Sequence, residues 1–248
     1  MTCFCCAICP GGGPGAITSA CPPCSCASRS EASSSNRVSS SRRIRSSFGP
    51  NRSPRMIDWP LRMPQILIVT GDAGESYEAL YAVHRFREED WRVSVAAPSI
   101  RRLHLVMHDF EPGWDTYVER PGYGLEADLS FDQVDVGDYD AVLILGGRAP
   151  EYLRNDRRLL DIVREFDVQK KWIFAICHGI QVLAAADLTR GKRITCYQHV
   201  RFEAEQAGGT FVDQQAVRDG RVVTGQTWQS HPEFYREIFA CFASPLRS

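Results

Sequence analysis

The sequence predicts an α/β protein with a doubly wound, mainly parallel sheet flanked by helices, in a single domain over residues 63–248. Two observations carry this prediction. From residue 65 onward, short runs rich in β-branched apolar residues alternate with longer amphipathic segments. The apolar runs are continuous rather than alternating, which is typical of parallel strands buried on both faces. The hydrophobic share of 44% suffices for such a core.

The expected elements follow one another as this fold requires. Strands are expected at 65–70, 92–96, 141–145, 172–176, 194–197, 211–217 and 221–224. Helices are expected at 75–89, 156–168, 179–186, 200–207 and 232–242. Residues 101–124 show little periodicity and are expected to form an ordered excursion. In the first helix, the larger side chains mark the expected inner face: Tyr77, Leu80, Tyr81, His84 and Phe86.

Charge and composition separate the first 62 residues from the rest. They hold eight Arg, no Lys and two acids, whereas residues 63–248 hold 21 bases and 28 acids. They are also rich in Ser, with a composition that cannot bury enough apolar surface to fold. We expect a disordered tail, either a targeting peptide or an upstream extension before a natural start at Met63. The chain would accordingly be cytoplasmic, or in a chloroplast or mitochondrion if the tail is a transit peptide.

Cysteines are equally uneven, with seven of the ten at positions 3–26. A third interpretation of the tail is a zinc site, since two Cys-x-x-Cys pairs occur there, at 6 and 9 and at 21 and 24. The residues between the pairs carry no hydrophobic pattern around which a zinc ribbon would fold. Elsewhere, three scattered cysteines fit a reducing compartment.

The junction at 173–179 points to chemistry. A buried strand ends at Cys177 and a helix begins within two residues, with Ala175 and Gly179 as small flanking residues. This is the form of a nucleophile elbow, which presents a strained nucleophile beyond the carboxyl end of a strand. A helix N-terminus there favours the thiolate, and its N–H groups can stabilise an oxyanion. Cys196 and Cys241 lack this context and are expected to be structural.

The chain resembles the ThiJ/PfpI family at three ordered signatures. They are Ala175-Ile176-Cys177-His178-Gly179, Gly146-Gly147-Arg148-Ala149-Pro150-Glu151 and Gly71-Asp72-Ala73-Gly74-Glu75-Ser76-Tyr77-Glu78. The resemblance implies the flavodoxin-like fold of class I glutamine amidotransferases. A finer similarity, to plant glutathione-independent glyoxalases, lies in 108–122, with His108, Tyr117 and Glu119, and in 225–234. One departure is Ile180, where many relatives have proline.

The resemblance also implies roles. Cys177 matches the family nucleophile, and Glu75 matches the carboxyl that contacts its sulfur and transfers protons, with Glu78 as a rival. His178 matches the histidine beside the nucleophile, and Glu151 matches the acid that orients this histidine, often across a subunit interface. The backbone amides of Gly147 and His178, with neighbouring Gly146, match the oxyanion and substrate-binding site. No metal or organic cofactor is implied.

Three functions remain open from the sequence. The first is an enzyme that converts 2-oxoaldehydes to 2-hydroxy acids through a Cys177 hemithioacetal. The resemblance also implies deglycase activity on early glycation adducts, which would use the same hemithioacetal chemistry. The second is a cysteine peptidase or amidase, and the third is a redox-sensing, chaperone-like stress protein. The expected partners are a small 2-oxoaldehyde and further copies of the chain, as a dimer or larger homo-oligomer. The net charge of −1 gives no case for nucleic acid or membrane surfaces.

Overall fold

The computed structural model describes residues 63–243. The tail expected over 1–62, with its targeting and zinc interpretations, lies outside the described residues. Within the described part of the chain, no helix is both long and apolar enough to span a bilayer.

A seven-stranded sheet forms the centre of the fold, in the order β10-β11-β7-β6-β1-β2-β5. Its strands are β1 (Gln65–Val69), β2 (Arg92–Ala97), β5 (Leu129–Ser130), β6 (Ala141–Ile144), β7 (Trp172–Ile176), β10 (Ala216–Asp219) and β11 (Val222–Gly225). Every neighbouring pair is parallel except β10 and β11. The central strands β1, β6 and β7 are buried along almost their whole length, as continuous apolar runs require. The predicted doubly wound, mainly parallel sheet is therefore confirmed.

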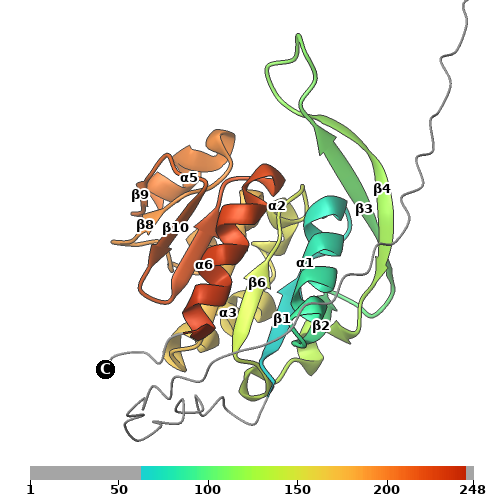
Figure 1. Ribbon diagram of the computed structural model, residues 1–248, viewed down its shortest axis with the longest axis vertical. Coiled ribbons are helices and arrows are strands. Elements are labelled where there is room, and N and C mark those ends of the chain that lie inside the picture. The colour runs from blue at the N-terminus through green and yellow to red at the C-terminus, as the bar shows by residue number, and fades with distance from the viewer. Residues whose placement is uncertain (1–62, 244–248) are drawn as a thin grey trace, which may run out of the picture. The chain divides into compact units, whose positions relative to one another are not determined.

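Helices cover both faces of the sheet (Figure 1). From β1 to β2 the chain moves one way across the sheet, and from β6 to β7 the opposite way. Right-handed crossovers therefore place α1 (Ser76–Glu88) and α3 (Arg157–Val168) on opposite faces. The last helix, α6 (His231–Ala243), lies beside α1, where the rings of Phe86 and Tyr235 meet at a tilt of 55° with their centroids 5.5 Å apart. Two short helices lie on the same side as α3. They are α4 (Ile180–Ala185), which contacts α3, and α2 (Pro150–Leu153), which contacts α4.

The inner face of α1 differs from the expected one. The residues that face the sheet are Ser76, Glu78, Ala79, Ala82, Val83 and Phe86. Tyr77 is half exposed and His84 is exposed, so the aromatic stripe lies to the side of the sheet contact. Small alanines let the helix approach the strands closely, which explains why the largest side chains did not identify the buried face.

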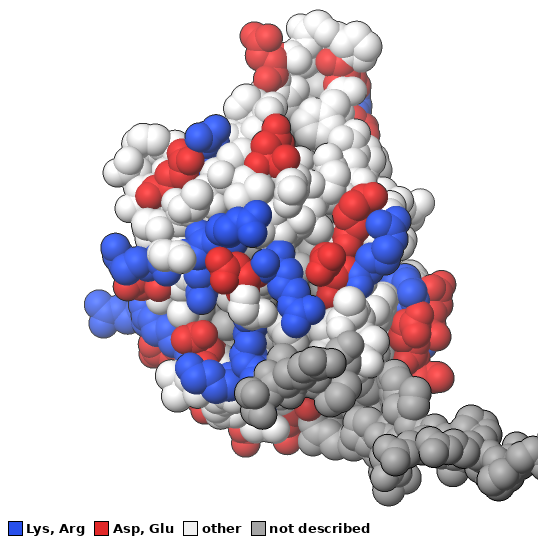
Figure 2. Space-filling view, turned by 60° about the vertical axis from the view of Figure 1, so that its left-hand side comes forward, with Lys and Arg blue, Asp and Glu red and all other residues white. Residues whose placement is uncertain are grey.

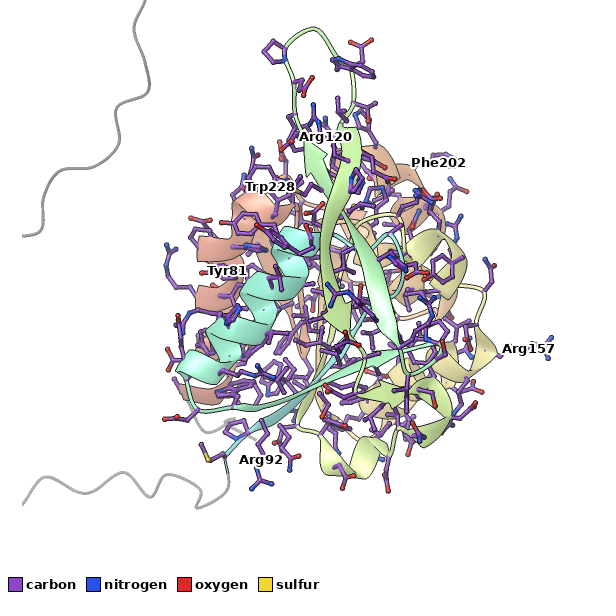
Figure 3. All side chains as sticks on the ribbon, turned by 90° about the vertical axis from the view of Figure 1, so that its right-hand side faces the viewer. Tyr81, Arg92, Arg120, Arg157, Phe202 and Trp228 are labelled. Atoms are coloured by element: carbon purple, nitrogen blue, oxygen red, sulfur yellow. The ribbon has the colours of Figure 1, made fainter. Side chains whose placement is uncertain are left out.

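Residues expected as an excursion form a two-stranded antiparallel arm, β3 (Arg102–Asp109) and β4 (Val118–Glu126), that extends past the sheet (Figures 1 and 3). Two backbone hydrogen bonds join the arm to the loop after β1. The Ala73 N–H donates to the His104 carbonyl at 2.7 Å, and the Val106 N–H donates to the Gly74 carbonyl at 2.9 Å. A register shift between His104 and Val106 interrupts the alternation of β3, which hid the strand in the sequence.

The C-terminal third holds further differences. The strand expected at 211–217 is two strands, with β9 (Thr210–Phe211) pairing in parallel with β8 (Arg193–Ile194) and β10 joining the main sheet. Between β8 and β9 lies α5 (Arg201–Gln206). Positive and negative side chains are intermixed over the face seen in Figure 2. Exposed pairs such as Arg190 with Asp187 bind one another.

Candidate active site

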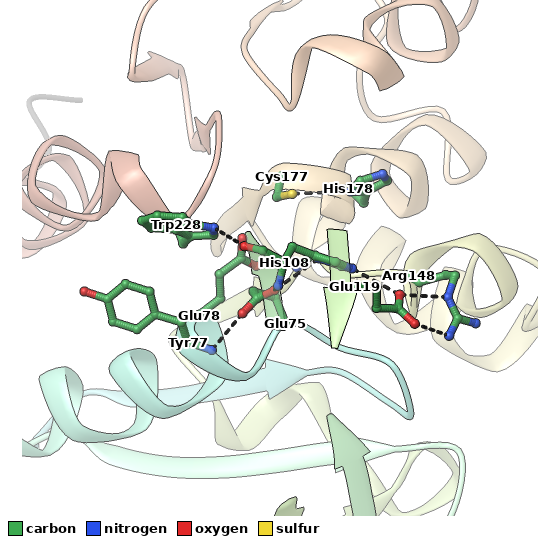
Figure 4. A network of polar contacts seen from close by, with 10 residues as sticks. Glu75, Tyr77, Glu78, His108, Glu119, Arg148, Cys177, His178 and Trp228 are labelled. Carbon is green, nitrogen blue, oxygen red and sulfur yellow. Dashed lines mark hydrogen bonds and ion pairs between the residues drawn. The ribbon is translucent and has the colours of Figure 1, made fainter. Parts of the chain in front are cut away.

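The carboxyl ends of four neighbouring parallel strands, β1, β6, β7 and β11, meet at one edge of the sheet. The loop after β1 carries Glu75, the loop after β6 carries Gly146 and Gly147, and Cys177 follows β7 directly. Trp228 comes after β11. This edge is where ligands bind in open α/β sheets, so the predicted residues converge where the fold can use them (Figure 4).

Cys177 has the conformation expected of a nucleophile elbow. Its φ is +58°, in the left-handed region that non-glycine residues rarely adopt, and it is only 7% exposed. A single 3-10 turn over Cys177–Gly179 leads into α4. A side chain on Gly179 would place its Cβ 2.5 Å from the Ile144 carbonyl oxygen, so glycine is required there.

Three polar groups surround the thiol. The Cys177 sulfur lies 3.3 Å from Nδ1 of His178, and the backbone N–H groups of Gly147 and His178 both bond to it. Burial and then the charge of Glu78 raise the pKa of the Cys177 thiol well above its ordinary value, and the two amides oppose that shift. The expected stabilisation of the thiolate by the helix start is therefore outweighed by burial, and the thiol needs a proton acceptor when it reacts.

Glu78 is the carboxyl that meets the thiol. Its side chain is fully buried beside the Cys177 thiol, and Oε2 accepts the Gly146 N–H at 2.7 Å. Burial, followed by the charge of Glu75, raises the pKa of Glu78 to about 8. At neutral pH this carboxyl therefore holds its proton and can donate it.

Glu75 has a different position from the expected one. It caps α1, with Oε1 accepting the Tyr77 N–H at 3.0 Å. Oε2 accepts the backbone N–H of His108 at 2.9 Å and lies 3.1 Å from Nδ1 of the same histidine. Both oxygens are occupied by N–H groups, so the prediction that Glu75 is the carboxyl on the sulfur is corrected in favour of Glu78. The reason is geometric, because a capping side chain folds back onto its own helix end.

Gly146 also departs from its expected role. Its N–H donates to Glu78 rather than facing the space above the sulfur. Its absent side chain matters more, since a Cβ there would lie 2.5 Å from the Cys177 Cβ and 3.0 Å from the sulfur. Gly147 has a φ of +75°, and its N–H faces the Cys177 thiol. Its oxyanion role stays a prediction.

His178 is a neutral base at physiological pH. Burial, and then the positive charges of His108 and His199, lower the pKa of His178 to about 4. The imidazole can therefore accept the proton of the neighbouring thiol. Within one chain, no hydrogen bond joins His178 to Glu151, which lies exposed at the start of α2. The expected orientation of His178 by Glu151 therefore stays a prediction about a second subunit.

The arm adds charged residues for which the sequence indicated no role. His108 on β3 lies between Glu75 and Glu119, and Arg148 makes a two-pronged contact with Glu119 (Figure 4). All four residues lie in segments that carry the resemblance described above. Their meeting depends on the pairing of β3 with β4, which residue spacing did not reveal.

Comparison with known proteins extends the resemblance to the whole folded part. The DJ-1/PfpI family description matches residues 64–241. Protein DJ-1 homolog D of Arabidopsis thaliana is 37% identical over 183 residues, covering 71% of this chain and 47% of that protein, so the chain spans about half its length. Deglycase PfpI of Pyrococcus furiosus is 32% identical over 162 residues, or 65% of this chain and 89% of that protein.

Solved structures agree on the fold. Schizosaccharomyces pombe DJ-1 superposes with a TM-score of 0.60 at 21% identity, covering 73% of this chain and 92% of that one. At this identity the likeness concerns the fold alone, and the matched sequence supplies the rest. The chain belongs to the DJ-1/PfpI family.

Proposed function

We propose that the protein converts 2-oxoaldehydes such as methylglyoxal and glyoxal to 2-hydroxy acids, without glutathione and through a covalent adduct on Cys177. One observation carries the proposal, namely a thiol held between a protonated carboxyl, Glu78, and a neutral imidazole, His178. An internal redox isomerisation needs a nucleophile and two proton carriers, and no outside oxidant or reductant.

In the first step the Cys177 sulfur forms a bond to the aldehyde carbon, C1, while its proton passes to Nδ1 of His178. Negative charge develops on the aldehyde oxygen, O1, near the N–H groups of Gly147 and His178 that already face the sulfur. Glu78 then gives its proton to O1. The product is a hemithioacetal, beside a Glu78 carboxylate and a His178 imidazolium.

The second step moves hydrogen from C1 to C2. Glu78, now ionised, removes the proton from C1, and the electron pair forms the C1–C2 double bond as His178 protonates the C2 oxygen. The enediol receives a proton at C2 from Glu78 and returns the O1 proton to it, which leaves a thioester. Water then cleaves the carbon–sulfur bond, with His178 carrying a proton from water to sulfur, and the 2-hydroxy acid leaves.

The relatives support catalysis more broadly than this one reaction. The Pyrococcus furiosus relative bears the name deglycase, as does Protein/nucleic acid deglycase 2 of Escherichia coli. A hemithioacetal at Cys177 would form equally well from an aldehyde released by a glycation adduct. The burial of Cys177, only 7% exposed, favours small aldehydes over a peptide backbone. A peptidase would also need an acid on His178, and no acid of residues 63–243 hydrogen-bonds its ring.

The test measures lactate formed from methylglyoxal in the absence of glutathione, for the wild type and for Cys177→Ala. Cys196→Ala is the matched control, because Cys196 is also a buried free cysteine and the charged groups that act on its thiol belong to α5 rather than to the site. We expect Cys177→Ala to lose activity to background and Cys196→Ala to keep most of it. Residual activity above roughly a tenth of wild type in Cys177→Ala would contradict the proposal.

A further inference from the structure

A buried histidine outside the reacting groups joins the arm to the active site. The His108 ring is 5% exposed and lies between two carboxylates, with Nδ1 at 3.1 Å from Oε2 of Glu75 and Nε2 at 3.1 Å from Oε2 of Glu119. Its backbone N–H also donates to Glu75, and the Trp228 indole N–H donates to its carbonyl at 3.2 Å. Figure 4 shows these contacts as one continuous network.

The donors and acceptors fix the charge of this ring. A neutral imidazole has one N–H, so one of its nitrogens would direct a lone pair at a carboxylate oxygen. An imidazolium donates from both nitrogens and satisfies both contacts. Burial alone would lower the pKa of His108, but the hydrogen bonds that the ring donates to Glu75 and Glu119 outweigh burial and raise the pKa.

Both carboxyl groups also accept hydrogen bonds from other donors. Glu119 receives Nε and Nη2 of Arg148 at 3.0 and 2.8 Å, and this contact lowers the pKa of Glu119. Glu75 already accepts the N–H groups of Tyr77 and His108. The other groups facing the ring are the neutral phenol of Tyr117, with ring centroids 4.1 Å apart, and more distantly His178.

The network ends on the loop that carries the amide of the reaction site. Arg148 directly follows Gly147, whose N–H faces the Cys177 sulfur. The Arg148 N–H donates to the Ala73 carbonyl at 2.7 Å, so this loop is also tied to the loop leading into Glu75. A displacement of Glu119 would therefore be transmitted through Arg148 to the Gly147 amide.

We propose that His108 is a positioning residue, an imidazolium that locks the β3–β4 arm to the cap of α1 and to the Gly147–Arg148 loop, so that the Gly147 amide stays aimed at the Cys177 sulfur. The charge of His108 has a second effect at the same site, because it helps to keep His178 neutral and able to accept the thiol proton. This inference rests on Cys177 being the nucleophile of the proposed function.

The test compares His108→Gln with His104→Gln. His104 is on the same strand with an exposed side chain, so its replacement controls for loss of a histidine from β3. At pH 7 we expect His108→Gln to slow both kcat for 2-oxoaldehyde turnover and alkylation of Cys177 by iodoacetamide, each about tenfold or more, a part of what losing an oxyanion donor costs. His104→Gln should stay within about twofold of wild type.

A pH profile separates positioning from mere stability. Wild-type alkylation, expressed relative to the thiolate fraction, should decline at alkaline pH as His108 loses its proton, and His108→Gln should lack this decline. Nitrogen NMR of the wild-type imidazoles should show one histidine doubly protonated at pH 7 that the His108→Gln spectrum lacks. Should His108→Gln fail to fold, Glu119→Gln serves instead, and the wild-type spectrum decides the charge.

The outcomes for the two proposals are distinct. If iodoacetamide alkylates Cys177 of the wild-type protein but the protein turns over no 2-oxoaldehyde, the proposed function is wrong. The alkylation test of His108 would still be valid. A neutral His108 at pH 7, or a His108→Gln variant with wild-type alkylation rates and pH profile, would overturn the positioning role.

Discussion

Glu78 and Glu75 lie three residues apart in the sequence, yet replacing each by glutamine should change stability in opposite directions. Glu78 is fully buried with a pKa raised to about 8 from an ordinary value of 4.5. Between these two values the unfolded state binds fewer protons than the folded state, so stability falls as the pH rises from about 4.5 to 8. At pH 7 the gap of about 2.5 units corresponds to roughly 3 kcal/mol.

Glu78→Gln imitates the protonated carboxyl and removes that penalty. We therefore expect this variant to gain up to about 3 kcal/mol in the free energy of unfolding at pH 7, and almost nothing at pH 4, where wild-type Glu78 is protonated in both states. Its turnover should fall by about two to four orders of magnitude, because an amide cannot transfer protons. Iodoacetamide should still alkylate Cys177, which separates loss of proton transfer from loss of the nucleophile.

Glu75→Gln is the matched control and should lose stability. A glutamine there directs an NH₂ group at the N–H donors of Tyr77 or His108, leaving buried donors unpaired at a cost of about 1–3 kcal/mol. Urea unfolding at pH 4 and pH 7, with lactate production at pH 7, tests both variants. If Glu78→Gln were less stable than wild type at pH 7, or kept most of its turnover, the assignment of the protonated carboxyl to Glu78 would be wrong.

Two further predictions concern the neighbouring loop. Gly146→Ala places a methyl group 2.5 Å from the Cys177 Cβ. It should lower the free energy of unfolding in urea by about 1–3 kcal/mol and abolish most of the turnover. In the control Gly137→Ala the new methyl group meets only the side chain of Asp135, so stability and turnover should change little. Glu151→Gln, at an exposed position, should leave the unfolding free energy within about 0.5 kcal/mol. If a second subunit directs Glu151 at His178, turnover should fall about tenfold with the oligomer intact by light scattering; unchanged turnover would rule out that role.

The fold and the position of Cys177 were predictable because each depends on local pattern. Continuous apolar runs identified the central strands, and a strand that ends at Cys177 before a helix determined the edge of the sheet at which its sulfur lies. The small residue required at Gly179 was likewise visible in the sequence, since it follows from the tightness of a single turn.

Choosing between Glu75 and Glu78 needed the register of α1. One residue of difference in the helix start decides which acid caps and which faces the sheet, and helix ends are the least certain part of a pattern. A usable signal was present, because Glu78 shares the buried face with Ala82 and Phe86 at helical spacing. The large aromatic residues of α1 indicated the neighbouring stripe as the buried face instead. The two strands of the arm were not predicted for a similar reason, because the register shift near His104 interrupts the alternation of β3.

The protonation of Glu78 could not have been read from the sequence, because it depends on residues from four separate segments. Charges alternate along the network, positive on Arg148, negative on Glu119, positive on His108 and negative on Glu75. Glu78 comes next, buried and beside a negative carboxylate with no cation of its own, so neutrality is its least costly state. The order of charges therefore explains why one of two nearby carboxyls is a fixed acceptor and the other holds its proton at neutral pH.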